Sequence, residues 1–276
     1  MALKITCVER VLVGTADLEA ARTRWSRAGF AVAPDEIRSN AIEFARMAAG
    51  GVEIDLCAAD ASASGPLADA IKGAAARGGA AIGWIWGVVG EEPDVPRSGA
   101  SIAIPGTDGT VAHARLLPDK RGARLPGVFT ATAEVTSSLE ARRVNLGGFG
   151  ANANTVTYLE HIVVMTPILE DAIAAHGSIG VACKRIREVG NGARQAFFKL
   201  EQTVLEVVGP ARGEPGCWGL AFMCADIDRA VGIARKSGLQ ATEPKPAIQG
   251  GKIARIVDPL DGVAVAFMEP PPAPAR

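Results

Sequence analysis

Residues 159–172, LEHIVVMTPILEDA, resemble residues 8–21, VERVLVGTADLEAA, and this repeat decides the fold. Each copy is a short apolar strand, then a small residue or threonine, then the acidic start of a helix. The two copies are offset by 151 positions, so that Arg10 aligns with His161. A repeat of this kind predicts an architecture built from one supersecondary unit used several times.

A third copy, CWGLAFMCADIDRA, occupies residues 217–230 and follows the first by 209 positions, so that Gly219 takes the place of Arg10. Glycine just beyond a helix supplies a left-handed C-terminal cap at low steric cost. The same two offsets relate the three glycines that follow the predicted helices: Gly29, Gly180 and Gly238. Each copy is therefore predicted to end its helix at the same point.

The copies end in apolar, alternating runs: GGVEIDLC (50–57), QTVLEVVGP (202–210) and DGVAVAFMEP (261–270). Alternation, branched residues and glycine-led turns indicate antiparallel strands rather than another helix. The predicted unit is therefore one strand, one helix and three strands, in about 50 residues.

A second copy has to fit between residues 80 and 118, where the pattern is degenerate. AIGWIWGVVG (81–90) is predicted as its opening strand, and GTDGTVAHARLLPD (106–119) as its closing hairpin strand because of the Asp-Gly turn. Its helix is missing or eroded, since residues 91–100 contain two prolines. Residues 60–79 are predicted to form a Ser/Gly/Ala-rich linker followed by a short helix.

The boundary between two halves is predicted near residue 152, which gives an N-terminal domain of residues 1–151 and a C-terminal domain of residues 152–276. Residues 119–156 contain a basic loop, a candidate strand, FTATAEVTS, and a Gly/Asn-rich stretch, all typical of a connection. A chain of 276 residues is also a comfortable length for two domains.

The composition excludes several classes of function. The 29 basic and 30 acidic residues are mixed along the chain, which argues against a nucleic-acid partner. The five cysteines form no CxxC pair, so neither a disulfide framework nor a thiolate zinc site is expected. With no signal peptide and no apolar stretch of the roughly 20 residues that a bilayer requires, a cytoplasmic protein without a membrane partner is predicted.

The opening-strand sequence EHIVV and the closing-strand sequence LEVVGP resemble those of the vicinal oxygen chelate superfamily. This superfamily includes glyoxalase I, bleomycin-resistance proteins and extradiol dioxygenases. Residues 158–210 look like its glyoxalase-like bacterial members. The resemblance covers three modules clearly and one loosely. It implies an α+β fold of four βαβββ modules, the second degenerate, that form two curled mixed-sheet cups. It also implies a divalent metal ion inside a cup, bound by His or Gln of an opening strand and Glu of a closing strand.

The ligand positions implied by the resemblance are filled unevenly in this chain. The third module places His161 and Glu206 there, 45 residues apart, and the first places Arg10 and Asp55 there at the same spacing. Arginine has no lone pair to offer a metal. The fourth module has Gly219 and Ala266, which also cannot bind one.

In the second module, His113 is predicted at the closing position, and the opening position lies near Trp84 or Trp86. The C-terminal cup thus offers His161 and Glu206, and the N-terminal cup Asp55 and His113, whereas a catalytic metal site needs three protein ligands. One divalent metal ion is a candidate cofactor with an incomplete ligand set, and no other cofactor is expected.

Without a metal, His161 and Glu206 would form an acid–base dyad suited to proton abstraction next to a carbonyl group. Alternatively, Glu206 forms a salt bridge with Arg194. For Arg10, a buried structural ion pair with Asp55 is favoured over binding an anionic ligand.

Three residues are candidates for substrate binding: Arg194, Phe197 and Trp218. Tryptophans and phenylalanines of the chain either line a pocket or, more commonly, pack the core. His176, near the end of a predicted helix, is expected at the surface.

Two classes of function follow. The first is a lyase-, isomerase- or dioxygenase-like enzyme that acts on a small oxygenated organic molecule in the C-terminal cup, with a structural N-terminal half. The second is a metal-free protein of the bleomycin-resistance type, which sequesters an apolar ligand against aromatic walls. The expected partner is a small molecule in both cases, and a homodimer is an open alternative for the assembly.

Overall fold

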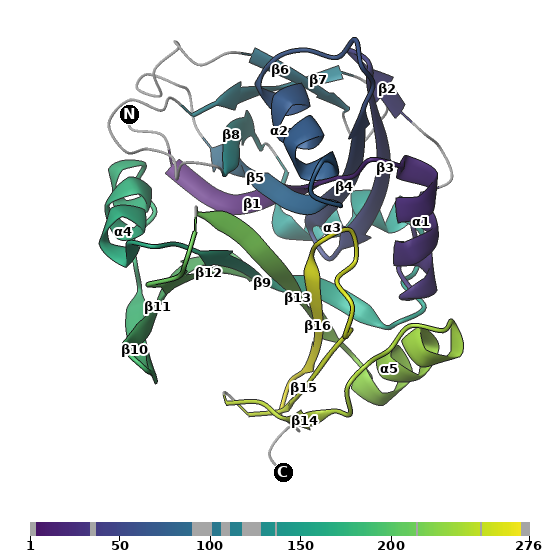
Figure 1. Ribbon diagram of the computed structural model, residues 1–276, viewed down its shortest axis with the longest axis vertical. Coiled ribbons are helices and arrows are strands. Elements are labelled where there is room, and N and C mark those ends of the chain that lie inside the picture. The colour runs from purple at the N-terminus through teal and green to yellow at the C-terminus, as the bar shows by residue number, and fades with distance from the viewer. Residues whose placement is uncertain are drawn as a thin grey trace.

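Two eight-stranded curled sheets, one from each half of the chain, make up the protein (Figure 1). The predicted α+β fold with two cups is confirmed. Among the described residues, no helix is long and apolar enough to cross a membrane. The computed structural model describes residues 4–33, 37–89, 101–105, 111–117, 128–135, 137–213, 215–248 and 250–271.

The N-terminal sheet has the strand order β2-β3-β4-β1-β5-β8-β7-β6. Its strands are β1 (Lys4–Gly14), β2 (Ile37–Ser39), β3 (Ile42–Ala49), β4 (Val52–Ala59), β5 (Ala80–Val89), β6 (Ser101–Pro105), β7 (Val111–Leu116) and β8 (Phe129–Glu134). The helices of this half are α1 (Leu18–Arg27), α2 (Pro66–Ala75), α3 (Leu139–Leu146) and the short 3₁₀ helix η1 (Gly147–Phe149).

The C-terminal sheet repeats this order as β10-β11-β12-β9-β13-β16-β15-β14. Its strands are β9 (Val156–Met165), β10 (Arg185–Gly190), β11 (Ala193–Leu200), β12 (Thr203–Gly209), β13 (Gly216–Cys224), β14 (Lys245–Pro246), β15 (Lys252–Arg255) and β16 (Ala264–Glu269). Its helices are α4 (Leu169–Ser178) and α5 (Ile227–Lys236).

Each module joins its opening strand to its own closing strand in parallel, as β1 with β4, β5 with β8, β9 with β12 and β13 with β16. The opening strands of two successive modules then pair antiparallel at the centre of each sheet. Modules one and two therefore build the N-terminal cup, and modules three and four build the C-terminal cup. The break between the sheets lies between β8 and β9, around the predicted division at residue 152.

The second module differs from its prediction at the closing strand. The opening strand over residues 81–90 is confirmed as β5, but the strand beside it is β8, from the FTATAEVTS segment. The run with the Asp-Gly turn provides β7 instead. An Asp-Gly turn marks a hairpin without telling which of its strands returns to the opening strand. Residues 91–100, where an eroded helix is predicted, lie outside the described residues.

The helix ends follow the predicted pattern. Asp17 and Asp226 cap α1 and α5, since each side chain accepts a hydrogen bond from the backbone N–H three residues later. The glycines beyond the helices, Gly29, Gly180 and Gly238, have φ angles of 86°, 82° and 84°. The predicted left-handed caps are confirmed, so the repeat extends to the backbone conformation at the helix ends.

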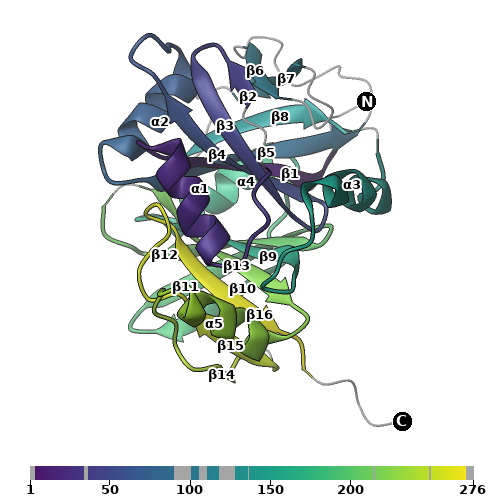
Figure 2. The ribbon, with the colours of Figure 1, turned by 90° about the vertical axis from the view of Figure 1, so that its right-hand side faces the viewer.

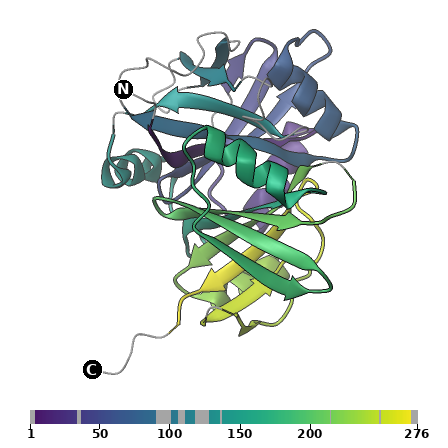
Figure 3. The same cartoon turned by 90° about the vertical axis from the view of Figure 1, so that its left-hand side faces the viewer.

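The main core lies between the convex faces of the two sheets. Figure 2 shows α1 reaching from the N-terminal sheet toward the C-terminal one, and Figure 3 shows α4 between the sheets on the other side. Trp84 and Trp86 of β5 are buried in this core rather than in a cup. His176 is only 5% exposed and its ring stacks on Trp84. The prediction that His176 is at the surface is wrong because the other half of the chain covers the end of α4.

The Asp-Gly turn before β16 joins the two halves. Asp261 accepts hydrogen bonds from Thr15 Oγ1 and Trp25 Nε1, both at 3.0 Å, and pairs with Arg24. A Cβ atom on Gly262 would lie 2.0 Å from the backbone oxygen of Gly79, so only glycine fits this contact. This turn therefore fixes the C-terminal cup against the first module.

The two cups differ in what lies on their concave sides. Helix α2 is the short helix predicted after the linker in residues 60–79. It lies in the N-terminal cup (Figure 1), where Leu67 and Ile71 pack with Leu12, Ile85 and Phe129. The C-terminal cup has no helix on its concave side among the described residues, and its strands β9, β11 and β12 alternate buried and half-buried residues. The C-terminal cup is therefore the open one.

Candidate active site in the C-terminal cup

The predicted ligand positions share one strand register. In the third module, His161 pairs with Val204, and Glu206 lies two residues beyond that partner on β12. In the first module, Arg10 pairs with Glu53, and Asp55 lies two residues beyond it. Because side chains two residues apart on a strand share a face, both pairs lie on the concave side of their sheets. The 45-residue spacing therefore corresponds to a real equivalence of position.

The second and fourth modules carry glycine and alanine at these positions. Gly219 pairs with Val163 across the centre of the C-terminal sheet, just as Gly83 pairs with Leu12 in the N-terminal one. A Cβ atom on Gly219 would lie 2.7 Å from the Ala264 backbone oxygen. The opening and closing strands therefore approach too closely for a ligand side chain at this position of the fourth module.

The same constraint holds in the N-terminal cup. A Cβ atom on Gly83 would lie 1.7 Å from the backbone oxygen of Phe129. The register makes Gly83 and Ala131 the two ligand positions of the second module, in place of the predicted Trp84 or Trp86 and His113. His113 lies on β7, where it is exposed and its Nδ1 is 3.2 Å from Ser101 Oγ. The structure does not bring it to Asp55.

His161 and Glu206 meet on the concave face of the C-terminal sheet. Their Nε2 and Oε2 atoms are 3.8 Å apart. The other carboxylate oxygen, Oε1 of Glu206, accepts a hydrogen bond from Gln195 Nε2 at 2.5 Å. On the other side of the imidazole ring, His161 Nδ1 contacts the carboxylate of Glu160. The imidazole thus lies between two carboxylates, and one of these is held by an amide from β11.

A bulge in β9 places Glu160 beside the ring. His161 pairs with Ala221 and Leu159 with Phe222, so Glu160 has no partner of its own on β13. Bulges of this kind change the direction of a side chain and are common beside functional sites. A neutral His161 ring that carries its proton on Nδ1 would present that proton to the Glu160 carboxylate and its lone pair, on Nε2, to the open side of the cup.

Burial controls the charge of the pair. Burial, together with the positive charge of Lys199, lowers the pKa of His161 to about 4. Burial raises the pKa of Glu206, while the positive charge of Arg187 opposes that rise. At neutral pH the imidazole is therefore uncharged and able to accept a proton.

No protein-family model matches the sequence, and a search of curated proteins also finds no match. A fusion protein of a xylose isomerase-like TIM barrel and a 4-hydroxyphenylpyruvate dioxygenase superposes on 100% of this chain with a TM-score of 0.65 and 15% identity, over 51% of its own length. A variant of 4-hydroxymandelate synthase from Streptomyces coelicolor superposes on 99% of this chain, and on 95% of its own, with a TM-score of 0.63 and 12% identity. This chain has the vicinal oxygen chelate fold.

Methylmalonyl-CoA epimerase from Mycobacterium tuberculosis is also similar, with 22% identity over 43% of this chain and 91% of its own, at a TM-score of 0.37. The fold rests on the two full-length superpositions, and at 12–15% identity they leave the substrate to be argued from the site.

The residues of the cup do not fit the metal that the vicinal oxygen chelate superfamily implies. Only His161 and Glu206 offer donor atoms at the four positions of the C-terminal cup, because Gly219 and Ala266 have none. Within the described part of the chain, no group of three or more His, Cys, Asp or Glu side chains is placed to hold a metal ion. A catalytic metal needs three protein ligands, so no chemistry is assigned to a metal here.

The predicted substrate-binding residues lie in different places. Phe197 pairs with Glu206 across β11 and β12, and its ring centroid is 6.5 Å from that of His161. Arg194 is not brought to this face, since its guanidinium pairs with Glu170 of α4. The predicted alternative of an Arg194–Glu206 salt bridge is replaced by the contact with Gln195, one residue further along. Trp218 is 54% exposed and follows Cys217 at a bulge in β13.

Four polar residues of the site escaped the sequence analysis: Glu160, Arg187, Gln195 and Lys199. Gln195 and Lys199 lie two residues on either side of Phe197, so strand alternation from Phe197 would have found them. Glu160 gave no such signal, because alternation assigns it to the opposite face from His161 and only the bulge changes that.

In the N-terminal cup, the equivalent positions hold a buried ion-pair network. Arg10 Nη1 donates to Asp55 Oδ2 at 2.8 Å, and the same atom is 3.3 Å from Glu53 Oε1. All three residues are at most 1% exposed. The predicted buried ion pair of Arg10 and Asp55 is confirmed, and Glu53 is an additional member.

Proposed function

We propose that the C-terminal cup binds a small oxygenated organic molecule and that His161 and Glu206 act on it as an acid–base pair without a metal. The observation that supports this is the Nε2 to Oε2 distance of 3.8 Å on an open concave face. A carboxylate and an imidazole that are both largely buried cost free energy unless they are paired or used. The enzyme class that fits is an isomerase or lyase that removes a proton next to a carbonyl group.

In the proposed step, His161 Nε2 accepts a proton from the carbon next to the carbonyl group of the ligand. The electron pair of the broken C–H bond moves toward the carbonyl oxygen. The imidazolium that forms is stabilised by the Glu160 and Glu206 carboxylates on its two nitrogens, as in other carboxylate-supported histidine bases. Return of the proton to a different face or atom completes an isomerisation.

Cationic side chains border the pair and would hold the developing negative charge. Lys199 is close enough to His161 to lower its pKa, and Arg187 acts on Glu206 in the same manner. Arg187 pairs with Gln195 across β10 and β11, so both lie on the face that carries Glu206. Such charges stabilise an oxyanion in a partly desolvated site.

The test is proton exchange in D₂O, followed by NMR, with hydroxyacetone and pyruvate as probes. We expect the protein to promote loss of the C–H signal of a probe. His161→Ala should slow that loss by about a hundredfold or more, the usual contribution of a positioned base. Arg194→Ala is the matched control, because it lies next to Gln195 but on the opposite face, and it should exchange at the rate of the unmodified protein.

Two results would contradict this function. Loss of exchange on treatment with a chelator, with about one metal ion per chain in the untreated protein, would show that the reaction depends on a metal. Saturable binding of the probes with no exchange would favour the metal-free sequestering protein instead.

A further inference from the structure

One row of paired residues crosses the open cup from the acid–base pair to the far edge of the sheet. His161 pairs with Ala221, Ala221 pairs with Ala266, and Ala266 pairs with Arg255 of β15. Residues paired directly across neighbouring strands project to the same face, so all four side chains lie on the concave side. Because strands lie about 4.8 Å apart, the row measures roughly 14 Å along the sheet from His161 to Arg255. An imidazole and a guanidinium therefore stand at the two ends of a short floor made of two alanines.

The equivalent row of the N-terminal cup supports this direction of the side chains. There Arg10 pairs with Ile85, Ile85 pairs with Ala131, and Ala131 pairs with Leu116. Ile85, Ala131 and Leu116 all pack in the apolar cluster that contains α2. Since the two sheets share one strand order and register, the matching residues of the C-terminal row face the interior of the open cup.

Two exchanges in this row make the open cup different from the filled one. Ala221 stands where the filled cup has Ile85, which leaves more space above the floor. Arg255 stands where the filled cup has Leu116, which places a positive charge on the concave face. Figure 1 shows β15 on the wall of the cup that faces β10 and β11. The face is therefore suited to a charged ligand rather than to an apolar helix.

The guanidinium of Arg255 has no hydrogen bond or ion pair with another residue of the described part of the chain. Its backbone is fixed, because its N–H donates to Thr242 Oγ1 at 3.0 Å, while the side chain is exposed. The cations on the other side of the cup already act on the protein. Lys199 Nζ donates to the backbone oxygen of Gln202 at 2.7 Å, and the charge of Arg187 acts on Glu206. Arg255 is thus the cation of the row that is left for a ligand.

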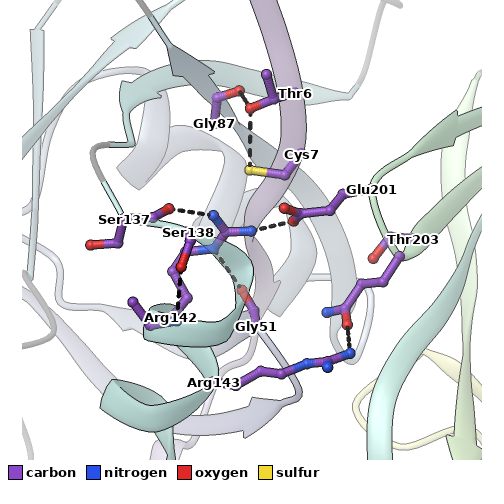
Figure 4. Close-up of polar contacts among 12 residues, drawn as sticks. Thr6, Cys7, Gly51, Gly87, Ser137, Ser138, Arg142, Arg143, Glu201 and Thr203 are labelled. Carbon is purple, nitrogen blue, oxygen red and sulfur yellow. Dashed lines mark hydrogen bonds and ion pairs between the residues drawn. The ribbon is translucent and has the colours of Figure 1, made fainter.

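Arg142 of α3 shows the opposite case (Figure 4). Its guanidinium donates to the backbone oxygens of Ser137 at 2.9 Å and Gly51 at 3.4 Å, and it pairs with the Glu201 carboxylate. All of these partners belong to the protein, so the role of Arg142 is structural. The same group in Arg255 lacks such partners, and its planar set of N–H donors points into an open cup.

We propose that the C-terminal cup takes an oxo carboxylate, with the carboxylate of the ligand on Arg255 and the carbon next to its carbonyl group at His161. A guanidinium presents two parallel N–H donors that match a carboxylate, and one carboxylate matches one unpaired cation. The small side chains of Ala221 and Ala266 leave room for the few bonds between the two groups. This inference rests on the proposed function, because it names the substrate class on which the same acid–base pair acts.

The first measurement is binding, which does not depend on the acid–base step. The ¹⁵N-labelled protein is titrated with sodium 4-oxopentanoate and, separately, with its neutral methyl ester. We expect saturable shifts of the Ala221, Arg255 and Ala266 amides with the carboxylate. The ester should bind at least about tenfold more weakly, because it lacks the charge that the guanidinium recognises.

Variants of β15 locate the carboxylate. Arg255→Gln should weaken binding of 4-oxopentanoate by about tenfold or more, the effect of losing a charge-assisted contact with two hydrogen bonds, and should leave binding of the ester unchanged. Arg255→Lys keeps the charge without the planar donors and should fall between. Lys252→Gln is the matched control, since Lys252 lies on the opposite face of the same strand and pairs with Asp228 at 3.1 Å. It should bind as the unmodified protein does.

Three results would overturn the proposal: no saturable binding of 4-oxopentanoate, equal binding of its ester, or undiminished binding by Arg255→Gln. Proton exchange of the same probe in D₂O separates this inference from the proposed function. Carboxylate-selective binding that depends on Arg255, with no exchange, would support the anion site and contradict the acid–base function. Exchange that is slowed by His161→Ala, but is equal for acid and ester and unchanged by Arg255→Gln, would support that function and overturn the anion site.

Discussion

The two cups of this protein have the same strand order and register, yet one is filled and the other is open. In the N-terminal cup, α2 covers the concave face and Arg10 neutralises Asp55 at the position where the C-terminal cup has His161 and Glu206. A guanidinium always stays charged and pairs permanently, whereas a buried, uncharged imidazole keeps a lone pair that can accept a proton. The same backbone thus provides a scaffold in one half and a candidate reactive pair in the other.

The largest expected effect comes from breaking the buried network of the N-terminal cup. Arg10→Ala would leave Glu53 and Asp55 buried without their main partner, and it should lower the free energy of unfolding by about 3–5 kcal/mol. Denaturant unfolding measures this change. His161→Ala, at the equivalent register position, is the comparison and should cost clearly less. An equal loss in the two variants would contradict the contrast between the cups.

The next effect concerns α2 as the filler of the N-terminal cup. Ile71 is fully buried against the concave face, so Ile71→Ala should cost about 3 kcal/mol of unfolding free energy through lost contacts and a cavity. Thermal or denaturant unfolding tests this. Ala70→Ser, on the less buried side of the same helix, should change the stability by less than about 0.5 kcal/mol. A negligible cost for Ile71→Ala would mean that the helix does not hold this cup closed.

A pH effect should come from the interface between the two halves. Burial lowers the pKa of His176 to about 4, below its ordinary value of 6.5. The unfolded chain therefore binds more protons between these pH values, and stability is lost as the pH falls from about 6.5 toward 4. The loss at about pH 5 should be near 2 kcal/mol for this residue. His176→Leu should flatten this part of the stability profile, and an unchanged profile would assign the acid sensitivity to other groups.

The smallest effect is expected on the outer face of the C-terminal sheet. Arg194 and Glu170 form an exposed ion pair, so Arg194→Ala should reduce stability by less than about 1 kcal/mol. It should also leave any ligand affinity of the cup unchanged. A loss of affinity comparable with that of His161→Ala would place Arg194 in the site after all.

The repeat predicted most of the fold because a fixed offset between copies transfers strand register and helix ends together. Because the offset is fixed, the repeat correctly predicted that His161 lies beside Glu206 and Arg10 beside Asp55. The repeat did not predict which of two neighbouring residues faces the cup: Arg194 was expected there, but Gln195 lies there instead. Neighbouring residues of a strand point to opposite sides of the sheet, so a shift of one residue changes the face. The short helix after the linker in residues 60–79 was predicted and is α2, but its place inside the cup was not, and His176 was placed wrongly at the surface. The burial of both depends on segments distant in the sequence. The closing strand of the second module was misplaced because a hairpin turn carries no information about parallel pairing.

The titration of His161 tests most directly whether the C-terminal cup holds a neutral imidazole ready to accept a proton. NMR of the protein with ¹⁵N-labelled histidine gives the pKa and the tautomer of this ring, and His161→Gln assigns its signals. We predict a pKa well below 6.5, near the value of about 4 that burial favours, with the proton of the neutral ring on Nδ1 beside Glu160. A pKa at or above 6.5, or a neutral ring protonated on Nε2, would contradict the proposed role of His161.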